Sequence, residues 1–213
     1  NLLRELGHVR NPVLLARAVM ERSPHVMLAG AGAEAFAREH HVALVDPDYF
    51  RTERRWHELQ AAQRQANRNE PVDHFGTVGA VALDVQGRLA AATSTGGMTD
   101  KRWGRIGDSP LIGAGTYANA ACAMSGTGWG EFYIRTAAAH AVCMRVAAMR
   151  QSVNEAAEAV INEAIPALGG SGGAIVLAAD GAFAMPFNTD GMFRGHIGND
   201  AEPRVAIWPN EHV

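Results

Sequence analysis

The stretch Gly76-Thr77-Val78-Gly79-Ala80-Val81-Ala82-Leu83-Asp84 decides the fold. Its small and β-branched residues predict a strand, and they follow an aperiodic polar segment, about residues 67–76, that we expect to be a flexible linker. A similar run over 88–95 comes after Val85-Gln86-Gly87, which predicts a β-hairpin. Two antiparallel strands of this kind can place Thr95 directly beside Thr77.

The junction between Gly76 and Thr77 suggests a chain that is cut there, so that the threonine becomes an N-terminus. Such a residue carries a nucleophile and a base together, because its freed α-amine, with a pKa of about 7.7–8.0, can take the proton of its own hydroxyl near neutral pH. A threonine that opens a strand is by itself usually structural. The linker, Gly76 and the second strand's ending in Thr93-Ser94-Thr95-Gly96-Gly97 together favour a nucleophile.

Composition predicts one soluble globular domain, since 47% of the 213 residues are hydrophobic and 19% are charged. A net charge of -3 provides no basic field for nucleic acid, and the sequence holds no apolar run long enough to predict a membrane helix. Cys122 and Cys143 lie in alanine-rich surroundings without metal-ligand spacing. We expect buried free thiols, a reducing compartment and hence a cytoplasmic location.

Outward from the hairpin, the pattern predicts helices and strands in both directions. Before it we expect a helix over about 12–22, a short strand over 25–29, a helix to about 40, an apolar run over 42–45 and a long polar helix from Asp48. After it we expect a helix of about eighteen residues from Glu131, a second helix over 152–165 that Ser152 and Glu155 begin as a capping box, and a hairpin of 174–179 with 182–187. The class is α+β, a layered sandwich.

Three other kinds of site fit the sequence poorly. The glycines of Gly30-Ala31-Gly32-Ala33-Glu34-Ala35 imitate a dinucleotide fingerprint, but Asp46 follows Gly30 by sixteen residues, where about twenty is usual, and no second half follows. A turn into a helix is the favoured interpretation. Nine histidines show no HExxH or HxxxH spacing for a metal, and Ser171, which lies between glycines, is interpreted as a loop serine that does not support a Ser-His-Asp triad.

An ordered set of motifs resembles the plant-type asparaginase/isoaspartyl peptidase family, a branch of the N-terminal-nucleophile hydrolases. The motifs are 10–13, 23–27, 76–82, 93–99, 104–110, 113–119, 127–131 and 186–192. The resemblance implies a four-layer αββα sandwich in a single domain over 1–213. Residues 1–76 would be the C-terminal part of the α-subunit with its linker, and residues 77–213 the β-subunit.

The resemblance also implies the roles of individual residues. Thr77 would be the nucleophile, both in cleavage of the Gly76-Thr77 bond and in catalysis, and Thr95 would support it. Arg105 and Asp108 would hold the substrate's α-carboxylate and α-amine, a division that their charges alone also suggest. The oxyanion hole would consist of Thr127 and the backbone N-H of Gly128, with Gly130 in the substrate site. The alternatives are a surface ion pair for Arg105 with Asp108, and close packing for Thr127.

The implied activity is that of an autoprocessing threonine hydrolase. It would cleave isoaspartyl dipeptides and the side-chain amide of L-asparagine through an acyl-threonine, with no cofactor, as a homodimer of processed αβ pairs. A glycosylasparaginase is an alternative, which Gly76 and Gly96 disfavour. The family's opening strand with His-Gly-Gly-Ala-Gly has no counterpart in residues 1–7. A second alternative is therefore a truncated, unprocessed and inactive homologue with an interaction role. The family's sodium site belongs to that segment, and no metal is expected.

Overall fold

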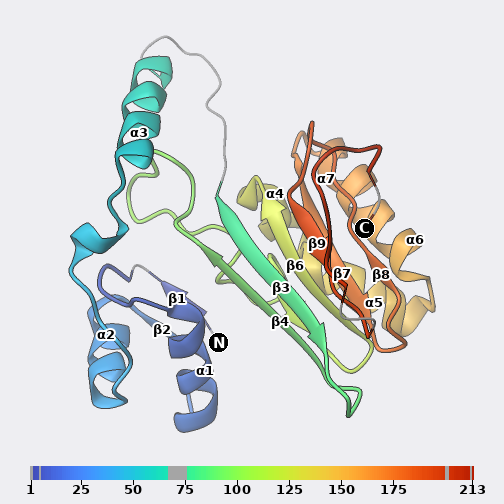
Figure 1. Ribbon diagram of the computed structural model, residues 1–213, viewed down its shortest axis with the longest axis horizontal. Helices are drawn as coiled ribbons and strands as arrows, with labels where there is room; N and C mark the ends of the chain where they lie inside the picture. The colour runs from blue at the N-terminus through green and yellow to red at the C-terminus, as the bar shows by residue number, and fades with distance from the viewer. Residues whose placement is uncertain (1, 5, 67–75, 200–201, 212) are drawn as a thin grey trace.

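The computed structural model describes residues 2–4, 6–66, 76–199, 202–211 and 213. Figure 1 shows a long hairpin, β3 with β4, in front of a second sheet, with helices behind that sheet and the N-terminal helices beside the hairpin. The predicted linker over 67–75 lies outside the described residues. Within the part that the structure describes, no helix is both long and apolar enough to span a bilayer.

The hairpin that the sequence predicts is confirmed. Strands β3 (Thr77–Leu83) and β4 (Leu89–Thr95) pair antiparallel from Thr77 opposite Thr95 to Leu83 opposite Leu89. The turn is fixed by Asp84, whose Oδ1 accepts the backbone N-H groups of Gln86 and Arg88, each at 2.9 Å. An aspartate that binds the backbone of its own turn in this way sets the length of the loop.

The second sheet has four antiparallel strands in chain order. They are β5 (Thr116–Ala118), β6 (Cys122–Gly128), β7 (Gly172–Ala178) and β8 (Phe183–Ala184). The predicted hairpin between β7 and β8 is confirmed around Asp180 and Gly181, although β8 is shorter than expected. This sheet packs closely on the first, because a Cβ at Gly79 would lie 2.2 Å from Ser125 Oγ.

Helices cover the far face of the four-stranded sheet and enclose the main core with it. They are α4 (Gly130–Thr136), α5 (Ala138–Met149), α6 (Val153–Glu158), the π-helical η2 (Ala159–Ala164) and α7 (Ile165–Ala167). Met124 of the sheet and Tyr133, Val142 and Ile161 of the helices are fully buried there. Burial of such side chains contributes about 1.5–3 kcal/mol each.

The single helix of about eighteen residues predicted from Glu131 is wrong. The helix is interrupted at Ala137, whose φ of 48° and ψ of 47° are left-handed. The cause lies outside the helix: the N-H groups of Ala139 and His140 donate to the carbonyls of Ala114 and Gly113, at 2.9 and 2.8 Å. The start of α5 is thereby attached to the loop before β5, and the helix is interrupted there.

The predicted helix over 152–165 is confirmed together with its capping box. Ser152 Oγ accepts the N-H of Glu155, and Glu155 Oε2 accepts the N-H of Ser152. The helix continues to Ala167 and widens over η2, where the N-H of Ile165 bonds to the carbonyl of Val160. Pro166 follows and has no N-H to donate, so an ordinary helical bond cannot form at that position.

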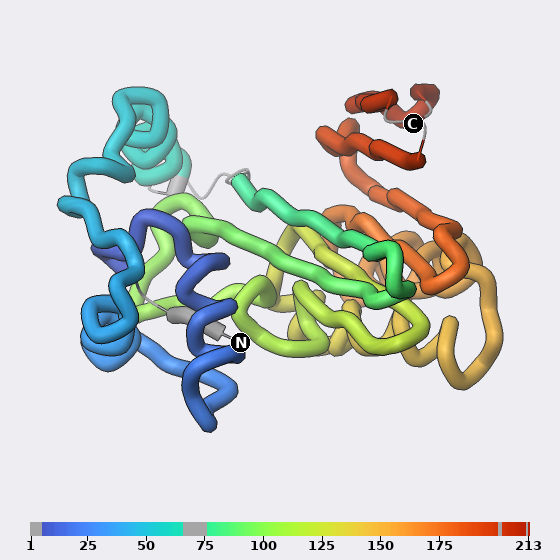
Figure 2. The backbone as a smooth tube through the Cα atoms, turned by 60° about the horizontal axis from the view of Figure 1, so that its bottom comes forward, coloured from blue at the N-terminus to red at the C-terminus, as the bar shows by residue number. Residues whose placement is uncertain are grey.

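The N-terminal part combines a parallel strand pair with helices. Its elements are β1 (Leu2–Arg4), α1 (Pro12–Arg22), β2 (Met27–Ala29), α2 (Gly30–Glu39), the 3-10 helix η1 (Pro47–Phe50) and α3 (Glu53–Ala66). Helix α1 begins at Asn11, whose side chain accepts the N-H of Leu14, and it lies over β4 (Figure 2). The strand predicted over 25–29 is shorter than expected.

The apolar run over 42–45 makes an isolated bridge, from Leu44 to Val9, and forms no regular strand. One expectation for this part is wrong. The long helix expected from Asp48 is two elements, η1 and α3, because Thr52 Oγ1 accepts the N-H of Arg55 and caps a new helix.

The α+β class is confirmed, with the layers in the order helices, four-stranded sheet, hairpin and α1. A further antiparallel pair, β9 (Arg194–His196) with β10 (Arg204–Ala206), lies towards the C-terminus. The packing of the two sheets brings the start of β3 together with the ends of β4 and β6. The site residues that the sequence predicts lie at this edge.

Candidate functional site

Thr77 and Thr95 face each other at the open end of the β3–β4 hairpin. Thr77 Oγ1 donates to Thr95 Oγ1 over 3.4 Å, a long contact for two hydroxyls. Thr95 Oγ1 in turn donates to the carbonyl of Gly76 at 3.3 Å and accepts the N-H of Gly97 at 3.0 Å. The hydroxyl of Thr95 therefore connects the predicted nucleophile with the carbonyl that it would attack.

Gly76 has a conformation that favours glycine. Its φ is +128°, and a Cβ at this position would lie 2.7 Å from Nη2 of Arg55 on α3. A larger residue would strain the backbone and displace the arginine. The predicted cleavage bond, between Gly76 and Thr77, thus lies between the end of the hairpin and helix α3.

Arg105 is held by a carboxylate that the sequence did not indicate for this role. Its Nε donates to Glu131 Oε1 at 2.8 Å and its Nη2 to Oε2 at 2.7 Å, a bidentate pair in which the arginine side chain is only 17% exposed. Two parallel hydrogen bonds fix the plane of the guanidinium. The alternative of a surface ion pair with Asp108 does not describe this arrangement.

Asp108 is a buried carboxylate, 6% exposed, and its Oδ2 has no hydrogen-bond partner among the described residues. Burial raises the pKa of Asp108 to about 6, against the opposing attraction of the Arg105 charge. Glycines make room for it: a Cβ at Gly115 would lie 2.3 Å from Oδ2 and one at Gly130 would lie 2.6 Å from Oδ1. A buried acid without a partner is suited to bind a cationic group.

Thr127 and Gly128 end β6, opposite Gly173 and Gly172 of β7. Gly128 has a φ of +143°, and a Cβ there would lie 2.4 Å from the carbonyl of Ser171. Only a glycine fits between these strands, which brings the backbone of β6 close to the site.

One small cavity of about 30 Å³ brings these residues together. Its lining consists of Gly76, Thr77, Thr95, Gly97, Met98, Arg105, Gly107, Asp108, Ser109, Thr127 and Gly128. Every predicted site residue is among them except Gly130, which lies beside Asp108 and Arg105, with a Cβ position 3.0 Å from Arg105 Nη2.

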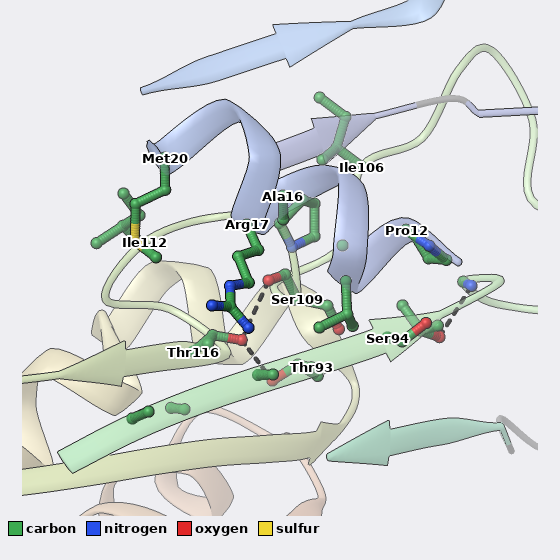
Figure 3. Close-up of a pocket in the computed structure, with 18 of the residues that line it drawn as sticks. Pro12, Ala16, Arg17, Met20, Thr93, Ser94, Ile106, Ser109, Ile112 and Thr116 are labelled. Carbon is green, nitrogen blue, oxygen red and sulfur yellow. Dashed lines mark hydrogen bonds between the residues drawn. The ribbon is translucent and has the colours of Figure 1, made fainter. Parts of the chain in front are cut away.

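A second, larger pocket of about 390 Å³ adjoins the small cavity, because both are lined by Thr95, Gly97, Arg105, Gly107 and Ser109. It lies between α1 and β4, as Figure 3 shows. Thr116 hydrogen-bonds there to Thr93 and to the carbonyl of Ser109 (Figure 3).

Sequence reasoning gave no role to three features in or beside the site. Glu131 appeared only as the last residue of the 127–131 motif and the start of a helix, and Arg55 only as part of a polar helix face. The third is a hydroxyl cluster between the two sheets, in which Thr93 contacts both Ser125, at 2.6 Å, and Thr116. The available signals were the acidic residue at the end of the 127–131 motif and hydroxyl side chains on strands that otherwise carry small apolar residues.

Two packed sheets between helices, with a threonine at the start of an inner strand and a second hydroxyl opposite it, define an N-terminal-nucleophile hydrolase arrangement. A family model described as asparaginase matches residues 3–207. The chain therefore belongs to the asparaginase family, as its motifs predicted.

Individual relatives agree with this assignment. The chain is 51% identical over 214 aligned residues to an isoaspartyl peptidase of Escherichia coli, with 95% of this chain and 66% of the relative covered. It is 39% identical to a putative isoaspartyl peptidase/L-asparaginase of Dictyostelium discoideum, with 89% and 64% covered. A probable isoaspartyl peptidase/L-asparaginase 2 of Arabidopsis thaliana is also 39% identical, with 94% and 69% covered. The chain spans about two thirds of the length of these relatives.

Proposed function

We propose that this protein is an autoprocessing threonine hydrolase that cleaves isoaspartyl dipeptides and the side-chain amide of L-asparagine. The observation that carries the proposal is the contact series from Thr77 through Thr95 to the Gly76 carbonyl, in one cavity with Arg105 and Asp108. The names of the relatives, isoaspartyl peptidase and L-asparaginase, support the same substrate class.

Self-cleavage comes first. Thr77 Oγ1 adds to the Gly76 carbonyl carbon, the Gly76-Thr77 C-N bond breaks, and the nitrogen takes up the proton to become an α-amine. In the intact chain this nitrogen is an amide and cannot act as a base, so the hydroxyl of Thr95 accepts from Thr77 while it polarises the carbonyl. Water then hydrolyses the Gly76 ester and leaves a free carboxylate.

Turnover uses the new N-terminus. The α-amine of Thr77 takes the proton of its own Oγ1, which attacks the β-carbonyl of the substrate, and ammonia or an amino acid leaves with a proton. The oxyanion lies at Thr127 and the N-H of Gly128, where loss of one donor typically costs about 3–4 kcal/mol of barrier. Water hydrolyses the acyl-threonine and releases aspartate.

The charged pair gives the site its selectivity. Glu131 occupies Nε and Nη2 of Arg105 and leaves N-H groups on Nη1 for the substrate's α-carboxylate. Ionised Asp108 receives the α-ammonium, which supplies the partner that its Oδ2 lacks among the residues described. A substrate must therefore carry both groups on one carbon, as the aspartyl part of both substrates does.

Assembly and location are part of the same proposal. We propose a homodimer of processed αβ pairs, on the ground of family membership, and a cytoplasmic location. The free, buried thiols of Cys122 and Cys143 are consistent with a reducing compartment. Light scattering on the processed protein tests the first statement, and fractionation of the source cells tests the second.

The function is tested by two measurements on the purified chain. Mass spectrometry should find fragments 1–76 and 77–213, and the processed protein should release aspartate from a β-aspartyl dipeptide and from L-asparagine. Thr77→Ala should abolish both, while Thr189→Ala, outside the cavity, should change neither. Aspartate release that survives in Thr77→Ala would refute the nucleophile. A wild type that is not cleaved and releases no aspartate would indicate the inactive homologue. Aspartate release from glycosylated asparagine alone would indicate a glycosylasparaginase.

A further inference from the structure

Arg55 of helix α3 covers one face of Gly76, although 21 positions separate the two residues in sequence. A side chain at position 76 would point straight at its guanidinium, with the Cβ at 2.7 Å from Nη2, 3.4 Å from Cζ and 3.6 Å from Nη1. A fixed positive charge therefore lies against the residue whose carbonyl is attacked in self-cleavage.

The position of this guanidinium is set by its own helix. Arg55 Nη1 donates to Glu58 Oε2 at 2.7 Å, and the N-H of Arg55 is held by Thr52 Oγ1 in the first turn. Hydrogen bonds from Arg54 and Arg55 lower the pKa of Glu58, so this anchor stays charged near neutral pH. Glu58 thus holds one edge of the guanidinium while Nη2 lies nearest Gly76.

The charge is placed for the self-cleavage step and not for substrate turnover. When Thr77 Oγ1 adds to the Gly76 carbonyl, negative charge develops on an oxygen for which Thr95 supplies a neutral donor. A preorganised cation nearby stabilises that charge. In turnover the substrate's oxyanion lies at Thr127 and Gly128 instead, and Arg55 does not line that cavity.

We propose that Arg55 is a positioning residue for self-cleavage: it holds Gly76 in its positive-φ conformation and stabilises the charge that forms on its carbonyl. This inference rests on the proposed function, since it requires cleavage before Thr77. After cleavage, the same guanidinium receives the new carboxylate of Gly76 and opposes re-formation of the ester.

The chain offers a matched control in Arg54. It precedes Arg55 on the same helix and donates to the same Glu58 through Nε at 2.9 Å, and its side chain is 83% exposed, against 48% for Arg55. Either Arg54→Ala or Arg55→Ala removes one exposed ion pair with Glu58, and such pairs contribute little to stability. Only Arg55→Ala also removes the charge beside Gly76.

The test follows cleavage of the full chain made by pulse-labelled cell-free synthesis. Arg55→Ala should cleave roughly tenfold more slowly than the wild type, a smaller loss than the roughly hundredfold or more for a buried oxyanion donor, because the Arg55 side chain is 48% exposed. Arg54→Ala should cleave at the wild-type rate, and Arg55→Lys should recover part of the loss. Millimolar ethylguanidinium should accelerate Arg55→Ala and leave the wild type unchanged. Once processed, Arg55→Ala should show wild-type kcat and KM for a β-aspartyl dipeptide.

The possible failures are distinguishable. A wild type that does not cleave overturns the proposed function and the role of Arg55 with it. Cleavage of Arg55→Ala at the rate of Arg54→Ala overturns the role of Arg55 alone. A slow variant that neither lysine nor ethylguanidinium rescues, or that loses thermal stability relative to Arg54→Ala, shows a merely structural arginine and also overturns it.

Discussion

The carboxylate of Asp108 lies directly against Gly115. A Cβ at position 115 would be 2.3 Å from Asp108 Oδ2, and the N-H of Gly115 donates to the Asp108 carbonyl at 3.1 Å. Gly115 therefore makes room for an acid that is buried without a partner for Oδ2 in the described part of the chain. Such an acid can bind a cationic ligand, but its unpaired buried charge lowers the stability of the protein without ligand.

Asp108→Asn should stabilise the folded protein at neutral and alkaline pH. Because the folded pKa of about 6 exceeds the ordinary 3.8, the native state binds the proton more tightly than the unfolded state. Stability therefore falls as pH rises from about 4 through 6, by about 3 kcal/mol for a shift of this size. Urea unfolding should show Asp108→Asn gaining about that amount at pH 8 and nothing near pH 4.

The control for this experiment is Asp180→Asn, in the exposed turn between β7 and β8. It measures what the change from a carboxylate to an amide does outside the cavity. If the gain of Asp108→Asn is the same at pH 4 and pH 8, ionisation of Asp108 is not the cause, and Asp108 is not a carboxylate whose buried charge costs stability.

Glu131→Gln should weaken substrate binding and leave the chemical step nearly intact. The carboxylate holds the Arg105 guanidinium by two hydrogen bonds, and an amide can accept only one of them. The arginine should then sample other orientations, so we expect KM to rise about tenfold, on the scale of a lost charged hydrogen bond, with kcat almost unchanged.

Steady-state kinetics with a β-aspartyl dipeptide checks this expectation. Glu163→Gln, an exposed residue on η2, serves as the matched substitution and should leave both constants unchanged. A fall in kcat at constant KM for Glu131→Gln would mean that the glutamate acts on the transition state and does not position Arg105.

Ala137→Gly should stabilise the protein by about 1 kcal/mol, because a left-handed backbone costs an alanine about 1–2 kcal/mol that glycine avoids. Ala141→Gly, inside α5, should destabilise it by a similar amount. Urea unfolding at constant pH measures both changes. Loss of stability in Ala137→Gly would show that the break before α5 is not strained.

The parts of the site that lie on one hairpin or in one motif could be predicted from the sequence. Thr77 and Thr95 meet because two strands joined by a short turn must pair, and alternation then determines which residues face each other. Pairing is local information, which a single sequence contains.

The remaining contacts depend on how distant elements pack. Arg105 and Glu131 are 26 positions apart, and β5 and β6 lie between them. Alanine has the highest helix propensity of all residue types, so the sequence gives no sign that the helix is interrupted at Ala137. The interruption follows from the hydrogen bonds of Ala139 and His140 to the loop before β5. Arg55 is a solvent-exposed residue, and its place beside Gly76 follows only from the packing of α3 against the hairpin.

The turn that Asp84 fixes by hydrogen bonds also determines the residue pairing at the far end of the hairpin. Seven residue pairs run from the turn to Thr77 and Thr95 in the cavity, and side chains alternate between the two faces along each strand. One residue inserted between Asp84 and Arg88 would shift the pairing and bring a residue of the opposite face across from Thr77. The number of residues in an exposed loop, rather than any contact inside the cavity, thus decides which side chain lies opposite Thr77.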